Sequence, residues 1–392
     1  MPQLRTPAAF MRGGTSKALV FHRRDLPADP AAWDGFFLAT MGSPDPHGRQ
    51  LDGMGGGVTS LSKVCVVGPP SRGDADIDYS FFQVLVREAR VSAFGNCGNM
   101  SAAMGPFAVD EGLVTAAGPL ATVRIHNTNT GKIVRATFAV EAGRALTSGD
   151  CRIPGVAGSG AAVRLDFLDP GGAGTGRLLP TGRPLDLLQV DGLGQVEVSI
   201  VDAANPCVFV AARSVGLAGT ELPEVLEDSD ALARLHAIGQ QAVGLMGLGH
   251  VFAAARKKLP LLAVVSAPKE APTLSGERLA AAGMDLCVRM LSNGQPHRAL
   301  PMTGAVCTVV AMHLPGTLPH RLARAPLASG GVRRLAMPSG VVGVDATVVE
   351  RDGQPHAEYA TVQRTARRLF DGFVYTSARA ITDDRRAGEP ME

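Results

Sequence analysis

The chain has 392 residues, and its 38 Lys and Arg against 36 Asp and Glu leave a formal net charge of only +2. One Trp, three Tyr and no basic run among aromatic residues exclude the usual footprint of a nucleic-acid-binding protein. No run approaches the ~18 apolar residues of a membrane span. A hydrophobic content of 45 % supplies the cores of about two domains, the number that this length suggests.

The beginning of the chain and its cysteines indicate a reduced, cytoplasmic protein. "MPQLRTPAAFMRGG" has no apolar core of signal-peptide length. The six cysteines are scattered without C-x-x-C or other paired spacing, so neither disulfides nor a metal site is indicated. Phosphate-loop and dinucleotide motifs are excluded, because serine precedes Lys17 and Lys63 and no G-x-G-x-x-G links a strand to a helix. The sequence therefore gives no support for a bound nucleotide.

The first half of the chain reads as a glycine-rich loop followed by short strands. In "DGMGGGVTSLSKVCVV" (52–67) the glycines permit a sharp turn, and the valines after Lys63 predict a buried strand. Lys63 therefore lies where a bendable loop becomes a rigid strand. Alternation predicts further strands at 76–86 and across 122–140, the latter with a turn at 129–132.

A break in composition separates this half from a second set of elements. Residues 169–194 are rich in Gly, Pro and Asp, which indicates an interdomain crossing. Residues 196–212 predict two strands around Asn205-Pro206, and 228–243 predicts an amphipathic helix. Later strands are predicted at 261–267, 285–291, 340–349 and 358–366.

The two halves share one local plan. "AFGNCGNMSAAMGPFAV" (93–109) and "ALPMTGAVCTVVAMHL" (299–314) each place a polar turn before a run of small apolar residues. Both predict a loop that opens onto a buried helix. Unless the likeness is a coincidence between two core helices, two such helix starts would face each other across a cleft between pseudo-equivalent domains.

Cys97 occupies a position that favours reactivity. We expect Asn96 to cap the first of these helices, which puts Cys97, Gly98 and Asn99 in its first turn. Backbone N–H groups are unpaired there and the helix dipole is positive. Such a site binds a carboxylate and stabilises a thiolate. The alternative is a buried, inert cysteine.

Lys63 is the candidate base. A free lysine, with a pKa of ~10.4, is a poor base at neutral pH. Enclosure in a desolvated cleft lowers this pKa, so that the amine can take a proton from carbon beside a conjugated carboxylate. Helix-start N–H groups would stabilise the negative charge that forms.

Six motifs in order, "MRGGTSK", "GSPDP", "DGMGGG…TSLSK", "GNCGN", "LPGT" and "PSG", resemble the PrpF-type 2-methylaconitate isomerase family. That family includes 4-oxalomesaconate tautomerases and methylitaconate isomerases, and the resemblance runs from about residue 5 to about residue 376. It implies an α+β, diaminopimelate-epimerase-like fold in which each of two domains wraps a sheet around a central helix. On this basis we expect an N-terminal domain at 1–182, a C-terminal domain at 183–376 and a tail at 377–392 that returns to the first domain.

The resemblance also implies an activity and its residues. It implies a cofactor-free allylic proton shift on an unsaturated di- or tricarboxylate, with Lys63 as catalytic base and Cys97 as catalytic thiol. Whether Cys97 acts as acid, base or polariser stays open. The resemblance places substrate contacts at Asn96, Gly98, Asn99, Thr15, Ser16, Thr303, Ser339 and Gly340. A homodimer is what relatives suggest, and a 2-methylaconitate substrate would place the chain in propionate catabolism.

Departures from the family pattern leave the substrate open. "MPSG" has Met337 where a histidine is common, and "HRALPMTGA" differs from the loop typical of 2-methylaconitate enzymes. Oxalomesaconate and methylitaconate therefore remain alternatives. Cys307 lies one turn too deep for a second thiol of the racemase type, and we predict that it is a core residue. A two-base racemase or a non-catalytic carboxylate-binding protein are the other readings.

The remaining ionisable residues receive structural interpretations. Arg364, Arg367 and Arg368 could bind a carboxylate or form a dimer interface, but we interpret them as a solvated face. His126 and His297 have no carboxylate at ligand spacing and are also expected to be structural. We expect a small-molecule substrate, with neither nucleic acid nor membrane as a partner.

Overall fold

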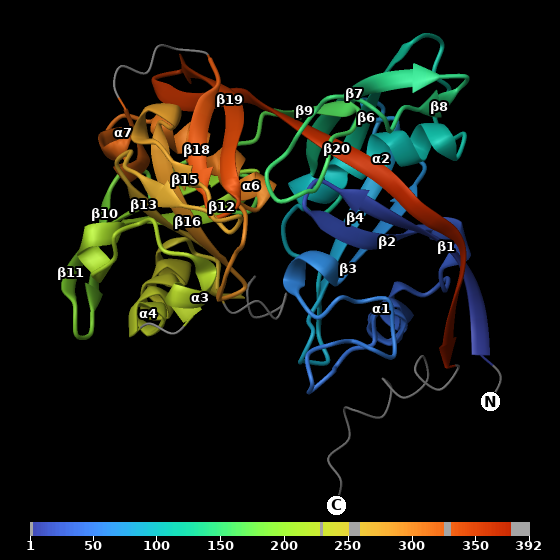
Figure 1. The fold of residues 1–392 in the computed structure, drawn as a ribbon, viewed down its shortest axis with the longest axis horizontal. Coiled ribbons are helices and arrows are strands. Elements are labelled where there is room, and N and C mark those ends of the chain that lie inside the picture. Colours follow the sequence, from blue (N-terminus) through green and yellow to red (C-terminus); the bar gives the residue numbers. More distant parts are fainter. Residues whose placement is uncertain (1–2, 228–229, 251–258, 325–330, 378–392) are drawn as a thin grey trace, which may run out of the picture.

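The computed structural model describes residues 3–227, 230–250, 259–324 and 331–377 and has two lobes (Figure 1). The strands of the first half are β1 (Gln3–Gly13), β2 (Ser16–His22), β3 (Lys63–Gly68), β4 (Ile77–Val84), β5 (Val91–Ser92), β6 (Leu120–Asn127), β7 (Lys132–Glu141), β8 (Arg144–Ala145) and β9 (Ala162–Leu168). Those that follow are β10 (Asp186–Val190), β11 (Gly194–Ala203), β12 (Asn205–Ala211), β13 (Leu261–Ser266), β14 (Ala271–Pro272), β15 (Arg278–Leu279), β16 (Leu286–Ser292), β17 (Gln295–Pro296), β18 (Arg333–Met337), β19 (Gly340–Arg351) and β20 (Gln354–Ser377). The α-helices are α1 (Trp33–Met41), α2 (Gly98–Asp110), α3 (Pro223–Glu227), α4 (Asp230–Leu245), α6 (Met302–Met312) and α7 (Leu318–Leu322).

The first lobe wraps a closed sheet around α2. Hydrogen-bonded pairs run from β1 through β2, β3, β4, β6, β7, β9 and β20 and back to β1. Every residue of α2 except the last, Asp110, is buried. A helix that is buried all round needs small or apolar side chains, and Ala102, Ala103 and Gly105 meet that need. The predicted helix at the centre of a sheet is therefore present.

The second lobe repeats this arrangement around α6. Its pairs run from β10 through β11, β12, β13, β16, β18 and β19 to β20. All residues of α6 are buried. On the other face of this sheet, Leu235, Ile238 and Ala242 of α4 pack against strand residues such as Val190 and Val264. The amphipathic pattern predicted a helix there. Its first two residues, 228 and 229, lie outside the described part of the chain.

One strand, β20, joins the two lobes. Its first part pairs with β19, its middle with β9, and residues 366–377 pair with β1. In Figure 1 it crosses between the lobes as a single red strand. The return to the first half thus takes place before residue 377, within residues that the sequence assigned to the second domain. The limits 1–182 and 183–376 otherwise stay a prediction, and 378–392 lie outside the described residues.

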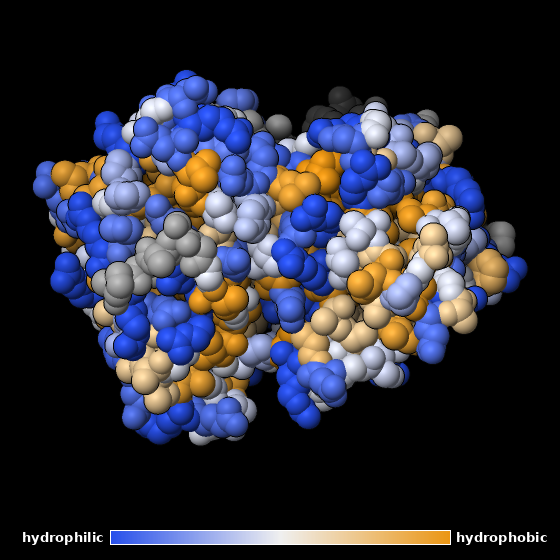
Figure 2. Space-filling model, turned by 90° about the horizontal axis from the view of Figure 1, so that it is seen from above, coloured by the Kyte–Doolittle hydropathy of each residue, from blue (hydrophilic) through white to orange (hydrophobic). Residues whose placement is uncertain are grey.

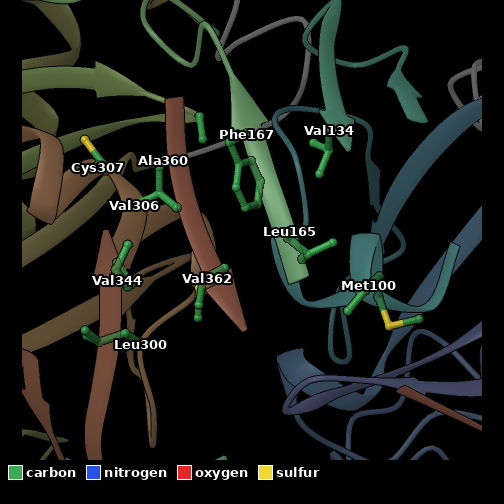
Figure 3. Close-up of a cluster of buried hydrophobic side chains, with 14 of the residues drawn as sticks. Met100, Val134, Leu165, Phe167, Leu300, Val306, Cys307, Val344, Ala360 and Val362 are labelled. Carbon is green, nitrogen blue, oxygen red and sulfur yellow. The ribbon is translucent and has the colours of Figure 1, made fainter. Parts of the chain in front are cut away.

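The largest apolar cluster of the described residues extends across both lobes. Met100 of α2 and Val306 of α6 belong to the same cluster of buried side chains. Figure 3 shows Ala360 and Val362 of β20, beside Phe167 of β9, in the part of this cluster that lies between Val306 and Met100. Shared core of this kind holds the two helix starts in a fixed relation.

Many of the strand predictions were confirmed. The strands β4, β6, β7, β11, β12, β13, β16 and β19 match the predicted ranges within a few residues. The sequence analysis did not predict the strands β1, β2, β5, β8, β9, β10, β14, β15, β17 and β18 or the helices α1, α3 and α7, and β10 lies within the predicted crossing at 169–194. β20 extends well beyond the predicted 358–366 in both directions.

Hydrophilic and hydrophobic residues are intermingled over the face seen in Figure 2, and neither kind covers a whole lobe. Among the helices of the described residues, none has the length and apolarity that a membrane crossing requires.

Candidate active site

The first turns of α2 and α6 line one pocket. The residues that line it come from both lobes: Ser16, Thr59, Lys63, Phe81, Gln83, Ser92, Phe94, Asn96, Cys97, Gly98, Asn99, Asn205, Leu261, Ser292, Asn293, His297, Pro301, Met302 and Thr303. Gly98 permits the close approach, because a methyl group added there would lie 3.0 Å from Cβ of Met302. The two helix starts therefore meet at a common cavity, as the sequence predicted. Lys63 and Cys97 both line it.

Lys63 begins β3, and its side chain is buried in the pocket wall. Nζ donates a hydrogen bond of 2.6 Å to Oε1 of Gln83 and lies 5.0 Å from the ring centroid of Phe81. Burial lowers the pKa of the Lys63 ammonium below its ordinary value, against a smaller opposing effect of the Cys97 and Cys65 thiols. No carboxylate among the described residues forms a salt bridge with Lys63. Burial therefore shifts Lys63 toward the neutral amine, which is the form that accepts a proton.

Gln83 is a site residue that the sequence analysis missed. Its Nε2 donates to the carbonyl oxygens of Ser62, at 2.8 Å, and Thr59, at 3.1 Å. These bonds fix the amide so that Oε1 faces Lys63. A glutamine in mid-strand gives no local signal, and only the cross-strand register of β3 with β4, which pairs Lys63 with Gln83, reveals it.

The cap prediction for α2 was wrong by one residue. Cys97, not Asn96, is the N-cap, and α2 begins at Gly98. Oδ1 of Asn96 instead accepts from Ser101 Oγ at 3.3 Å, so this side chain is turned into the protein. The Cys97 side chain makes no capping hydrogen bond and is partly exposed in the pocket. By helix geometry, the N–H groups of Gly98 and Asn99 have no partner within the helix.

Asn205 connects the two helix starts and was also missed. Its Nδ2 donates to the Asn96 carbonyl oxygen at 3.0 Å and to Thr303 Oγ1 at 2.8 Å, and its Oδ1 accepts from the Asn96 N–H at 3.1 Å. The sequence indicated only a strand break at Asn205. Thr303 lies in the first turn of α6. Cys307 is fully buried, and its Sγ lies 3.3 Å from the Val201 carbonyl oxygen, which confirms it as a core residue.

The two histidines lie in different surroundings. His126 pairs with Asp78, Nδ1 to Oδ1, at 2.8 Å, so the expectation that it lacks a carboxylate partner was wrong. His297 lines the pocket, and burial lowers its pKa to about 4, with a further lowering by the nearby Lys63. At neutral pH it is therefore uncharged.

The substrate contacts predicted outside the helix starts divide into two groups. Ser16 lines the pocket. Thr15 adjoins it, because its Oγ1 accepts from Nδ2 of Asn99 at 3.1 Å. Ser339 and Gly340 do not line the pocket. They lie against the loop at 154–155, where a methyl group added to Gly155 would come 3.3 Å from Thr15 and 3.5 Å from Ser339.

The arginine cluster is not a uniformly solvated face. Arg364 is only 2 % exposed, because β20 turns this residue toward α6, where its Nη2 lies 3.5 Å from Sδ of Met302. Arg367 is exposed, and Arg368 pairs with Glu111 and Asp371. The interpretation as a solvated face was therefore wrong for Arg364.

A larger cavity, of about 460 Å³, lies elsewhere, lined among others by Arg12, Cys151 and Arg367. Neither Lys63 nor a helix start lines this larger cavity. We therefore identify the pocket at α2 and α6 as the candidate active site because of its reactive residues and not because of its size. In the described part of the chain, no group of three or more His, Cys, Asp or Glu could hold a metal ion.

Solved structures support the architecture. The structure of methylitaconate-delta-isomerase superposes with a TM-score of 0.76 at 39 % sequence identity, covering 97 % of this chain and 98 % of that one. A hydroxyproline epimerase from Agrobacterium vitis superposes with a TM-score of 0.53 at 12 % identity, covering 96 % and 94 %. That likeness concerns the fold alone, and it confirms the epimerase-like fold predicted above.

Sequence comparison is more specific. The chain is 43 % identical to the putative isomerase YraM of Bacillus subtilis, covering 95 % of this chain and 98 % of YraM. It is 41 % identical to 3-methylitaconate isomerase of Eubacterium barkeri, covering 95 % and 97 %. The family profile described as PrpF protein matches residues 3–377. This chain therefore belongs to the PrpF family.

Proposed function

We propose that this protein is an isomerase that moves a proton along an unsaturated di- or tricarboxylate, with Lys63 as the base. The observation that carries the proposal is the pocket itself, where a desolvated lysine and a partly exposed thiol lie beside the starts of two buried helices. Relatives named 3-methylitaconate isomerase and 2-methyl-aconitate isomerase, 41 % and 37 % identical, support the reaction class.

The first step is removal of an allylic proton. The neutral Lys63 amine takes a proton from the carbon adjacent to the double bond, and the two electrons of that C–H bond enter the conjugated system. The product is a dienolate, whose negative charge spreads onto the carboxylate oxygens. General-base catalysis of this kind contributes about 10²–10⁴-fold in rate.

The second step returns the proton. Rotation about the former double bond, or protonation at the other end of the dienolate, gives a geometric isomer or a shifted double bond. Lys63 or Cys97 supplies the proton, and both line the pocket. The reaction conserves oxidation state, so the proposal calls for no redox cofactor.

The helix starts support the dienolate. Backbone N–H groups of Gly98 and Asn99 have no intrahelical partner and stand at the positive end of α2. Because these dipoles are fixed before the reaction, they stabilise the developing charge without reorganising. Asn205 holds this helix start to that of α6 and keeps the arrangement rigid.

The proposal also extends to the identity of the substrate. Among candidates, 2-methylaconitate is our first choice, with 4-oxalomesaconate and methylitaconate as alternatives. Met337, which marks a departure from the family pattern, is buried and its Sδ accepts from the Leu300 N–H at 3.1 Å. It therefore shapes the loop before α6 rather than lining the pocket.

The test is exchange of substrate hydrogen with solvent deuterium, followed by NMR across these acids. Lys63→Ala should fold normally and lose exchange by at least about 10²-fold. Lys132→Ala is the matched control, because this lysine pairs with Asp169 on the protein surface, away from the pocket. Exchange at the wild-type rate in Lys63→Ala would exclude Lys63 as the base.

The competing functions predict different results. A two-base racemase needs Cys307, whereas our proposal expects Cys307→Ala to retain exchange because that thiol is buried in the core. A non-catalytic carboxylate-binding protein would be stabilised thermally by these acids but would exchange none of them.

A further inference from the structure

A loop at residues 147–159 covers a cavity of about 460 Å³ beside β1 and β20. The cavity is lined by this loop and by three residues of the two strands, Arg12, Thr365 and Arg367. Their side chains lie on the face of the sheet opposite to that of Met11, which belongs to the core around α2. None of the residues that line the pocket at α2 and α6 lines this cavity. It is therefore a separate space, and the proposed reaction makes no use of it.

The loop that covers the cavity is held at its base and at its tip. At the base, Cys151 and Gly160 exchange two backbone hydrogen bonds of 3.0 Å. At the tip, Pro154 packs against Gly340 of β19, where an added methyl group would lie 3.1 Å from Cβ of Pro154. The cover is thus part of the folded protein, and the cavity is formed before a ligand binds.

Two positive charges face each other in this cavity. Arg12 of β1 and Arg367 of β20 are directly opposite in the antiparallel register. Burial lowers the pKa of the Arg12 guanidinium, and the charge of Arg367 lowers it further, so the two side chains repel each other. Like charges at opposite positions destabilise a sheet. Among the described residues that line the cavity, none is an Asp or Glu that would compensate this repulsion.

Hydrogen bonds fix one of these guanidinium groups and leave donors of both available. Nη1 of Arg12 donates to the carbonyl oxygens of Gly14 and Thr365 and to Oγ1 of Thr365, each at 3.0 Å. Arg12 forms no other side-chain hydrogen bond within the described part of the chain, so its Nε and Nη2 remain available. Arg367 is exposed and forms neither a salt bridge nor a side-chain hydrogen bond with a described residue.

Another pair of arginines in the same lobe shows how the protein itself compensates like charges. Arg124 of β6 and Arg135 of β7 are also directly opposite in register. Arg124 pairs with Asp76 and Arg135 pairs with Asp166, each at 2.9 Å. The two arginines of the cavity have no such carboxylates among the described residues. The difference indicates that their counter-charge comes from a ligand.

We propose that this cavity binds a small organic anion, whose phosphoryl or carboxylate group lies between Arg12 and Arg367. A guanidinium group presents parallel N–H donors that match either kind of group. The hydroxyls of Thr147, Ser148 and Ser159 line the same cavity and can donate to further oxygens of the ligand. Cavities that bind small organic molecules have volumes of about 300–1,000 Å³, so this one also accommodates a carbon skeleton.

The experiment is titration calorimetry with inorganic phosphate and with tricarballylate, a saturated tricarboxylate. Arg367→Gln removes one guanidinium at an exposed position and should weaken binding about tenfold or more. Arg367→Glu places a carboxylate opposite Arg12, so it should abolish this binding and raise the Tm of the unliganded protein. Arg213→Gln is the matched control, because Arg213 is also exposed but lies in the second lobe. The anion that binds more tightly identifies the group as phosphoryl or carboxylate.

Three results would overturn the proposal. They are a wild-type protein that binds neither anion, an Arg367→Glu protein that binds both with wild-type affinity and stoichiometry, and an equal loss of binding in Arg213→Gln and Arg367→Gln. Tricarballylate bound only in the pocket at α2 and α6 would give the second result. The inference does not depend on the proposed reaction, since a lack of deuterium exchange would refute that reaction and leave binding at Arg367 unaffected.

Discussion

The bond between Lys63 and Gln83 provides a direct test of the base. Nζ of Lys63 lies 2.6 Å from Oε1 of Gln83, so Gln83→Glu would place a negative charge in contact with the amine at almost unchanged shape. An opposite charge at such a distance favours the protonated amine and raises its pKa by about 1–3 units. Because the neutral amine is the active form, the rate rises with pH through this pKa.

The expected result is a shift of the acidic limb of the kcat/KM profile. In Gln83→Glu the limb moves to higher pH by about 1–3 units, and at a pH below the limb each unit costs about tenfold in rate. Gln83→Met is the matched control, because it removes the acceptor without adding a charge. Its limb should move to lower pH, since the ammonium loses a stabilising hydrogen bond.

The assay is the initial rate of solvent-deuterium incorporation at low substrate concentration, measured across pH. The kcat/KM profile reports groups of the free enzyme, which is the state that the structure describes. A Gln83→Glu limb at the wild-type pH, or below it, would refute the assignment of that limb to Lys63.

Two further results are expected. Asn205→Ala breaks the hydrogen bonds that join Asn96 to Thr303, so it should lower kcat/KM at least about tenfold. It should also lower the free energy of unfolding, measured by urea titration, by about 1–3 kcal/mol. Activity equal to wild type would show that Asn205 does not position the helix starts. His297 is neutral when folded, with its pKa lowered to about 4, whereas an unfolded chain binds a proton near pH ~6.5. Its contribution is therefore complete above that pH and is lost as the pH falls toward 4, by about 1–3 kcal/mol, and His297→Gln should flatten this part of the stability curve.

Many strands could be predicted because runs of β-branched and other apolar residues bounded by turn residues are typical of strands. The ends of the chain lack a clear signal of this kind. β1 and β2 flank the glycines of "MRGGTSK", where turn residues mask the pattern, and β1 carries Pro7. The C-terminal part of β20 contains polar and exposed residues such as Arg367 and Asp371, because it pairs along its length with β1 and faces solvent. Pairing between the two ends of a chain leaves no local trace.

The sequence predicted the helix starts of the candidate site but not the residues Gln83 and Asn205, which hold the site in place. Lys63 follows a glycine-rich loop and Cys97 stands between Gly95 and Gly98, and such glycines indicate a turn or a close approach. Gln83 and Asn205 act across strands or between lobes, so their partners are remote in sequence. Arg364 was misread for a related reason: its inward orientation follows from the alternation of β20, while the neighbouring arginines suggested a charged surface.

The path of β20 has a consequence for folding during synthesis. β1 is synthesised long before its partner, which is completed only when residue 377 has been made. Joining segments so far apart closes a loop of more than 350 residues, at an entropic cost of about 5 kcal/mol. The sheet of the first lobe therefore stays open until β20 has been made. A nascent chain that stalls before then exposes the unpaired edges of β1 and β9 to other protein chains.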